Sequence, residues 1–142
     1  MDVHPLVIHF PIVLIPLSAL CDMYGLWRAE QSWHRVAYSL LIGGVLASAL
    51  AVLTGNAAAA SHWGRAGVDP ILSTHENWAT ATLLGGLALV LGRLPLHLRQ
   101  AAHGRRLLPW TLGALLASAF VGAAAYYGGI LVYEHGVGVR GG

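Results

Sequence analysis

The fold is decided by the stretch LLPWTLGALLASAFVGAAAYYGGILVY, residues 107–133, which is apolar throughout and contains no charged side chain. A helix needs about 20 apolar residues to cross the hydrocarbon core of a bilayer, so this run can cross with some tilt. Three similar runs precede it, at about 5–27, 36–53 and 76–92. The third is short and glycine-rich, but it can be extended at both ends. The sequence therefore predicts an all-α integral membrane protein, a four-helix bundle formed by a single domain over residues 1–142.

The composition supports this class of protein. Of the 142 residues, 56% are hydrophobic and only 10% are charged, and the mean hydropathy is +0.64, whereas soluble domains carry roughly 25% charged residues. The net charge is +2, from eight arginines, no lysine and six acids, which is too small for a nucleic-acid partner. The first apolar run lacks the basic start and the small-residue cleavage site of a signal peptide, so we expect it to be retained as a span.

The arginines are distributed unevenly between the links. Most fall between the first and second runs or between the third and fourth: Arg28, Arg35, Arg93, Arg99, Arg105 and Arg106. The other two, Arg65 and Arg140, fall on the opposite side. Cytoplasmic links carry an excess of arginine and lysine, so the arginine-rich links are predicted to be cytoplasmic and both termini to lie outside. Asp22, near the inner end of the first run, is predicted to lie at the membrane interface or to pair with Arg28 or Arg35, because an unpaired carboxylate inside a span is costly.

Four of the eight histidines lie where apolar runs begin or end, and the predicted topology brings them all to the outer face: His4, His9, His75 and His135. Imidazole is poorly soluble in hydrocarbon, so several at one end of a bundle indicate a bound metal or haem rather than packing alone. The histidines among the arginines are expected to be solvated or to face lipid headgroups: His34, His97 and His103. His62, in the outer link, is ambiguous.

His9 and His75 are the preferred axial ligands for the iron of one haem b. At 1.5 Å rise per residue, His9 lies about 7–8 Å deeper in the bundle than His4. His75 begins a stripe of small residues on which a flat macrocycle could lie, formed by Ala79, Thr82 and Gly86. His4 and His135 are nearer the surface. They could bond the haem propionates, ligate a second haem or replace one member of the pair.

Two other interpretations stay open. Three or four of these histidines, with Glu76 or Glu134, could bind a bare zinc, copper or iron ion. Alternatively, the histidines cap helix ends and the protein is a cofactor-free assembly or scaffold subunit of a membrane complex. The sequence contains no haem-attachment motif, HExxH zinc motif, nucleotide-binding loop or nucleophile–base pair. A non-catalytic electron-transfer or accessory subunit is therefore expected rather than an enzyme.

Glycines and prolines predict how the spans pack and bend. The pairs Gly43-Gly44 and Gly85-Gly86 give the second and third spans small faces, which let helices approach closely in lipid. Gly55, after Thr54, is interpreted as the C-cap that ends the second span. The first run is interrupted by Pro11 and Pro16, each of which should bend its helix.

Four motifs stand out at residues 4–11 (HPLVIHFP), 54–55 (Thr-Gly), 75 (His) and 128–139 (GGILVYEHGVGV). Together they resemble the bacterial membrane-protein family called domain of unknown function 2231, over nearly the whole chain. The resemblance implies a small four-helix protein of the inner (cytoplasmic) membrane with a role in electron transfer; the arginine distribution predicts that its termini are periplasmic. Because 142 residues leave little room for a separate substrate site, we expect a subunit of a larger respiratory or redox complex, with a quinone or a periplasmic cytochrome as the candidate electron partner. The histidine-bearing motifs of the family match His4, His9, His75 and His135.

Overall fold

The computed structural model describes residues 3–60, 62–65, 67–101 and 104–138, and these ranges contain helices and no strand. The elements are α1 (His4–Val7), α2 (His9–Arg28), α3 (Gln31–Ala59), α4 (Asp69–Leu98), the 3-10 helix η1 (Gly104–Leu107) and α5 (Leu108–Tyr133). Four stretches are long and apolar enough to cross a membrane: His4–Arg28, Gln31–Ala59, Asp69–Leu98 and Gly104–Tyr133. The predicted all-α fold with four membrane-spanning helices is confirmed.

The second and third spans are longer than the apolar runs that predicted them. α3 has 29 residues and α4 has 30, which corresponds to roughly 45 Å of helix. The hydrocarbon core is only about 30 Å thick, so both helices extend beyond it at their ends. The apolar run marks the part of a helix that lies in hydrocarbon, whereas the backbone hydrogen bonds continue through the polar residues on either side.

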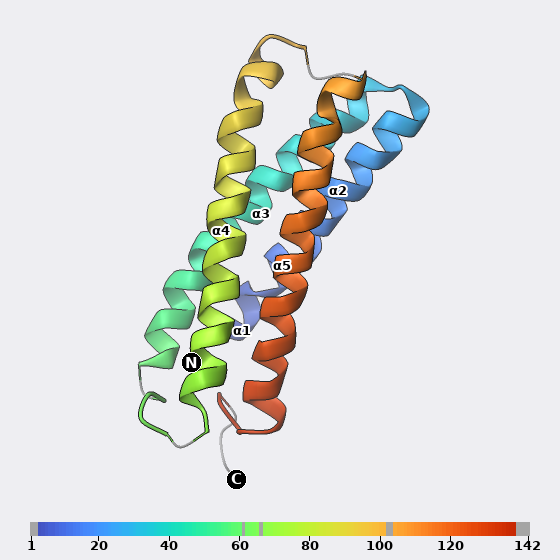
Figure 1. Cartoon of the computed structure of the whole chain (residues 1–142). Coiled ribbons are helices and arrows are strands. Elements are labelled where there is room, and N and C mark those ends of the chain that lie inside the picture. The colour runs from blue at the N-terminus through green and yellow to red at the C-terminus, as the bar shows by residue number, and fades with distance from the viewer. Residues whose placement is uncertain (1–2, 61, 66, 102–103, 139–142) are drawn as a thin grey trace.

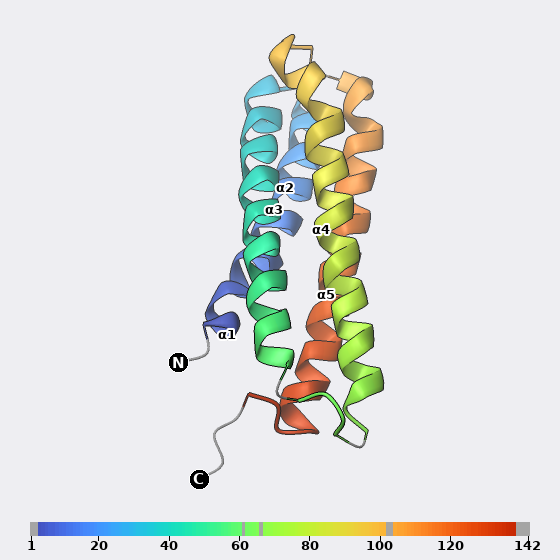
Figure 2. The same ribbon diagram turned by 90° about the vertical axis from the view of Figure 1, so that its left-hand side faces the viewer.

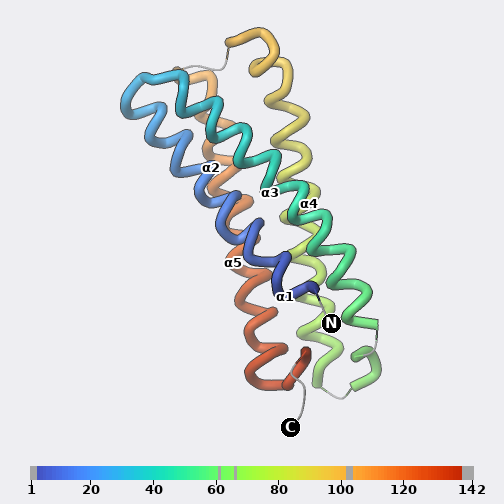
Figure 3. Tube along the Cα trace, turned by 180° about the vertical axis from the view of Figure 1, so that it is seen from behind, coloured from blue at the N-terminus to red at the C-terminus, as the bar shows by residue number. Residues whose placement is uncertain are grey.

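The four spans are arranged around a common centre (Figure 1). α2 packs against α3 and α5, and α4 packs against the same two helices. The α2–α3 pair passes behind α4 and α5 at an angle in Figure 1, and the view from behind shows the same crossing (Figure 3). Each long helix therefore contacts two long neighbours.

The two ends of the bundle differ in composition. The first, which we call the histidine end, holds α1, the described part of the link between α3 and α4 (residues 60, 62–65, 67 and 68) and the turn that follows α5 (Figure 2). The second, which we call the arginine end, holds the turn between α2 and α3 and the link between α4 and η1. Exposed arginines surround this second end: Arg28, Arg35, Arg99, Arg105 and Arg106. Arg140 and His103, which also entered the sequence predictions, lie outside the described residues.

A break at Ile8 separates α1 from α2, and α1 is visibly set off from α2 in Figures 2 and 3. Pro11 has no N–H to donate to the carbonyl of Val7, so the helix cannot continue through this turn with its full set of hydrogen bonds. The neighbouring bond, from the Ile12 N–H to the Ile8 carbonyl, is long at 3.4 Å. The bend expected at Pro11 is therefore present, and α1 packs against α3.

Glycines let bulky side chains of one helix lie directly on the backbone of another. A Cβ atom on Gly44 of α3 would lie 2.6 Å from Cγ1 of Ile15, and one on Gly86 of α4 would lie 2.7 Å from Cγ2 of Val45. Gly113 of α5 receives Leu89 in the same way. Close approach through small residues, predicted for these spans, is thus how the helices pack.

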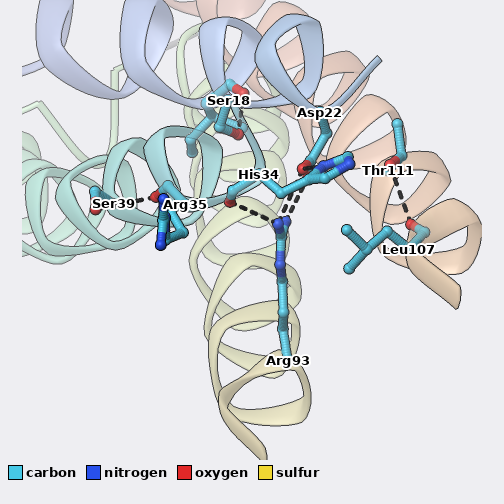
Figure 4. Close-up of polar contacts among 9 residues, drawn as sticks. Ser18, Asp22, His34, Arg35, Ser39, Arg93, Leu107 and Thr111 are labelled. Carbon is cyan, nitrogen blue, oxygen red and sulfur yellow. Dashed lines mark hydrogen bonds and ion pairs between the residues drawn. The ribbon is translucent and has the colours of Figure 1, made fainter. Parts of the chain in front are cut away.

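A buried polar cluster joins three helices at the arginine end (Figure 4). Asp22 of α2, His34 of α3 and Arg93 of α4 are only 1%, 2% and 1% exposed. Arg93 donates from both terminal nitrogens to the Asp22 carboxylate and also, at 2.8 Å, to the backbone carbonyl of His34. The Nδ1–H of His34 donates to Oδ1 of the same carboxylate at 2.8 Å. The guanidinium of Arg93 also lies over the ring of Tyr38.

This cluster corrects three predictions. Asp22 lies inside the bundle rather than at the interface, and it pairs with Arg93 rather than with Arg28 or Arg35. Arg93 lies within α4 rather than in a link, and His34 is buried rather than solvated. The physical reason is that each group is compensated by partners on other helices, which makes burial tolerable. A further histidine of this end, His97, is half-buried, and the centre of its ring lies 4.5 Å from the centre of the Tyr38 ring.

Candidate functional site

A cavity of about 500 Å³ lies between the helices in the histidine half of the bundle. All four spans contribute to its wall, mostly with alanine, glycine, valine, leucine and isoleucine residues. Its titratable lining residues are His4, His9, His62, His75, Glu76 and Tyr133. On α3 the lining extends from Ser48 to Ala59, which is roughly 16 Å along the helix axis. A mostly apolar cavity of this size with a few polar groups is the usual form of a cofactor or small-molecule site.

His75 is positioned by α5. Its Nδ1 lies 2.8 Å from the backbone carbonyl oxygen of Ala124. A carbonyl can only accept, so Nδ1 carries the proton and donates it. The neutral ring then has its lone pair on Nε2. Cε1 of the ring lies 3.2 Å from where a Cβ on Gly128 would be, so this glycine makes room for the imidazole.

His4 is positioned by α3 in a similar way. Its Nδ1 lies 3.1 Å from the hydroxyl oxygen of Thr54. That hydroxyl donates its one proton to the backbone carbonyls of Leu50, at 2.8 Å, and Ala51, at 3.2 Å. Its oxygen must therefore accept from His4, and Nδ1 of His4 carries the proton. A Cβ on Gly55 would lie 2.9 Å from Cε1 of this ring. Gly55 is thus inside α3 and beside His4, which corrects its interpretation as the C-cap of the helix.

The rings of His4 and His75 lie near one another in the lining of the cavity, in an edge-on arrangement. Their centres are 6.5 Å apart and their planes are nearly perpendicular, at 86°. Both rings have Nδ1 bonded to a neighbouring helix, so the nitrogen with the lone pair is Nε2 in each neutral ring. A second-shell hydrogen bond at one ring nitrogen is what metal-ligating histidines almost always have, because it orients the ring and raises the basicity of the other nitrogen.

The other predicted residues are placed differently. His9, on α2, lines the same cavity, but its side chain is exposed, and the ring that contacts His75 belongs to His4. His135 follows α5 and does not line the cavity; its ring lies beside Gly67. Glu134 is exposed, whereas Glu76 is half-buried and lines the cavity. Within the described part of the chain, no three His, Cys, Asp or Glu side chains converge in a way that would hold a metal ion.

His62 belongs to the cavity wall and was ambiguous from sequence. Its Nδ1 lies 3.1 Å from the carbonyl oxygen of Ala58, one turn earlier, and therefore donates to it. The link that carries His62 also contributes Val68, which packs with Ala59, Leu72 and Leu131 in a small apolar core. This core holds the link against the ends of α3, α4 and α5.

The turn after α5 closes the same end of the cavity. The N–H of Val137 donates to the carbonyl of Leu131 at 2.9 Å, and the N–H of Gly136 donates to Val132 at 3.1 Å. Gly136 has a φ of 63°, which suits glycine at the end of a helix. Val137 packs against the small apolar core and lines the cavity together with Gly138.

Only part of the predicted stripe of small residues on α4 lines the cavity. Ala79 and Thr82 follow His75 along α4 and line the wall, as expected. Gly86 does not, because the side chain of Val45 occupies the space beside it. The opposite wall is formed by small residues of α5, among them Ala124, Ala125 and Gly128.

Sequence reasoning did not find the positioning role of Thr54, Gly55, Ala124 and Gly128, although Thr54, Gly55 and Gly128 belong to motifs that it singled out. The sequence signal for this role was the presence of a threonine and glycines inside apolar stretches, where a polar or flexible residue usually has a specific structural function. The Ala124 contact is made by a backbone carbonyl and has no signal in the side-chain sequence.

Comparison with known proteins gives one match. The model of a family described as "Predicted membrane protein (DUF2231)" matches residues 1–141. No curated protein and no solved structure matches the chain.

Proposed function

The chain belongs to the DUF2231 family of predicted membrane proteins, and from this premise we propose that it is a small electron-transfer subunit that binds haem b between His4 and His75. The observation that carries the proposal is the pair of imidazoles that line one apolar cavity with both Nδ1 atoms hydrogen-bonded to a neighbouring helix. The proposed pair keeps His75 of the sequence prediction and takes His4 in place of His9.

The residues present fit the group. Bis-histidine haem ligation uses two imidazoles on opposite sides of one iron, and metal–imidazole bonds are about 2 Å long. Because two such bonds and part of each ring lie between the two ring centres, these centres should be on the order of 6 Å apart. The ring centres of His4 and His75 are 6.5 Å apart. Structural zinc sites use four protein ligands and catalytic ones three, so a histidine pair favours haem over a bare ion. The small residues of α4 and α5 suit a flat ring system.

The chain's own residues have distinct tasks in this proposal. His4 and His75 hold the group and keep their rings oriented through Thr54 and Ala124. The apolar wall excludes water, which tunes a redox potential through the local dielectric. Haem b bound there would supply reversible one-electron transfer between ferric and ferrous iron. The polar residues around the rim, His9, His62 and Glu76, are candidates to face the propionate groups or an incoming partner.

The proposed location is the bacterial inner membrane, with the arginine end in the cytoplasm. Arg93 lies inside the bundle, but the exposed arginines at that end still outnumber Arg65, the described arginine of the histidine end. The positive-inside rule then places the cavity near the periplasmic face. An electron partner would be a quinol in the bilayer or a periplasmic cytochrome. The chain is small, so we propose that it works as one subunit of a larger respiratory or redox complex.

The test is the visible spectrum of the purified full-length protein. A Soret band with sharp α and β bands after dithionite reduction is expected. His4→Ala and His75→Ala should each abolish the low-spin spectrum, because each removes one axial ligand. His9→Ala and His135→Ala are the matched controls and should retain it.

Other results would overturn the proposal in favour of its alternatives. Stoichiometric zinc, copper or iron by elemental analysis, without a Soret band, would identify a non-haem metal protein. No chromophore and no metal, with co-purification of a larger membrane complex, would identify an assembly or scaffold subunit. A low-spin spectrum that survives His4→Ala but not His9→Ala would return the ligand role to His9.

A further inference from the structure

We propose that Gly55 and Gly128 are positioning residues, which fix the ring orientation and the protonated nitrogen of His4 and His75 respectively. This inference deepens the proposed function and rests on it for one of its two readouts. Two different helices receive the two rings by the same arrangement. Each supplies a hydrogen-bond acceptor for Nδ1 and, within one turn of it, a glycine against Cε1: Thr54 and Gly55 on α3, Ala124 and Gly128 on α5.

The clearances show why a glycine is needed at both positions. A Cβ on Gly55 would lie 2.9 Å from Cε1 of His4 and 3.4 Å from each ring nitrogen. A Cβ on Gly128 would lie 3.2 Å from Cε1 and 3.3 Å from Nδ1 of His75. Both contacts are tighter than ordinary van der Waals packing. The contacted atom belongs to a rigid ring whose Nδ1 is already hydrogen-bonded, so relief requires the ring to rotate or shift away from its acceptor.

Neighbouring glycines do not share this feature. Gly129, next to Gly128 on the same helix, has no atom within 4 Å of a built Cβ, and neither does Gly122 one to two turns earlier. An added methyl group is therefore accommodated at Gly129 and Gly122 without any movement. The clearance is specific to the positions that face the two imidazoles.

Ring orientation matters because it decides which nitrogen carries the proton. With Nδ1–H donated to the helix, each neutral imidazole presents the lone pair of Nε2. A ring that turned away from Thr54 or Ala124 would lose this preference and exchange between its two tautomers. Loss of such an outer partner typically weakens metal binding by about 10–100-fold.

The experiment compares wild type with Gly55→Ala, Gly128→Ala and the control Gly122→Ala, all full-length in detergent; Gly122 is exposed and does not line the cavity. The first readout needs no cofactor: ¹⁵N spectra of histidine-labelled protein report which ring nitrogen carries the proton, with signals assigned through His4→Gln and His75→Gln. Gly128→Ala should shift the His75 signals toward a mixture of tautomers, and Gly55→Ala should do so for His4. Gly122→Ala should change neither. Unchanged tautomers in both glycine variants would overturn the inference.

The second readout is haem retention and the reduced spectrum of the same proteins. Gly55→Ala and Gly128→Ala should lose haem about 10-fold more readily than Gly122→Ala and show a high-spin fraction. A wild type without a Soret band would refute the proposed function while the tautomer readout still decides this inference. If the wild type binds low-spin haem and both glycine variants retain all of it, the inference about the glycines is refuted while the proposed function stands. If a glycine variant fails to fold, Thr54→Val, which removes the acceptor at nearly constant shape, should release the His4 tautomer without crowding.

Discussion

Asp22 and Arg93 show how two charges can be accommodated inside a membrane-spanning bundle. Each is almost completely buried, and the guanidinium donates two hydrogen bonds to the carboxylate. His34 supplies a third donor to the same carboxylate and a carbonyl acceptor to Arg93. A buried pair adds little stability compared with well-packed apolar residues, but removing one partner leaves a charge without compensation.

Replacing Arg93 should therefore be severe. We expect Arg93→Ala to lower the free energy of unfolding by about 3–5 kcal/mol, because Asp22 would remain buried without its cation. Unfolding of purified protein in mixed detergent micelles measures the change. Arg99→Ala removes an exposed arginine of the same end and should stay within about 0.5 kcal/mol of wild type. Equal effects of the two substitutions would show that the buried pair does not stabilise the bundle.

Single-residue geometry also limits what a sequence can predict at the candidate site. The gathering of His4 and His75 at one end follows from the topology, which the apolar runs and arginines indicate. The choice of His4 over His9 as the partner of His75 does not follow, because a continuous helix would turn the two histidines to different faces. The break at Ile8 changes the direction of His4, and the size of that change is set by contacts with α3.

At the level of helices, the prolines of the first span and the glycines of the others have complementary effects. Pro11 divides the first span and brings α1 against α3. Gly44 and Gly86 let α2 and α3, and α3 and α4, approach until side chains touch the opposite backbone. The sequence indicates both effects because proline and glycine act on the backbone directly. It does not indicate which bulky residue will fill each gap.

Gly44 gives a quantitative test of helix packing. An alanine there would place Cβ 2.6 Å from Cγ1 of Ile15 and 3.3 Å from its backbone nitrogen. We expect Gly44→Ala to destabilise the protein by about 1–3 kcal/mol, as overpacking of a filled interface does. Gly85→Ala is the control, since no atom lies within 4 Å of its built Cβ. Thermal unfolding should separate the two variants.

A compensating substitution makes the same test sharper. Ile15→Ala removes Cγ1, the atom nearest to the new methyl group, so the double variant should lose less stability than the sum of the two single variants. Strict additivity would indicate that the cost at Gly44 arises elsewhere than at Ile15.

At the level of the whole molecule, the spans, their order and their packing class were predictable, because lipid admits few ways to satisfy a backbone. The buried cluster of Asp22, His34 and Arg93 was not. These residues lie on three different helices, and a reading along the chain places all three at the cytoplasmic face, in links or at the membrane interface, rather than inside the bundle. Their complementarity appears only when the helices are placed side by side.

The orientation of the whole bundle can be measured directly. In a Cys21→Ser background, Trp63→Cys places an exposed thiol at the histidine end and Glu30→Cys places one at the arginine end. A membrane-impermeant maleimide should label Trp63→Cys in spheroplasts and Glu30→Cys only after lysis, because the arginine end is expected in the cytoplasm. The opposite labelling pattern would place the cavity on the cytoplasmic side.

The contact between Asp22 and Arg93 also bears on how the chain enters the bilayer while it is being made. The two residues are 71 positions apart, so the first span leaves the ribosome well before α4 has been synthesised. An aspartate or arginine at the centre of a span opposes insertion by about 2.5–3.5 kcal/mol, and less toward its ends. For both residues this penalty is relieved when the first span and α4 meet. We therefore expect the first span to stay beside the insertion machinery until α4 arrives, so that insertion and assembly of this bundle are completed together.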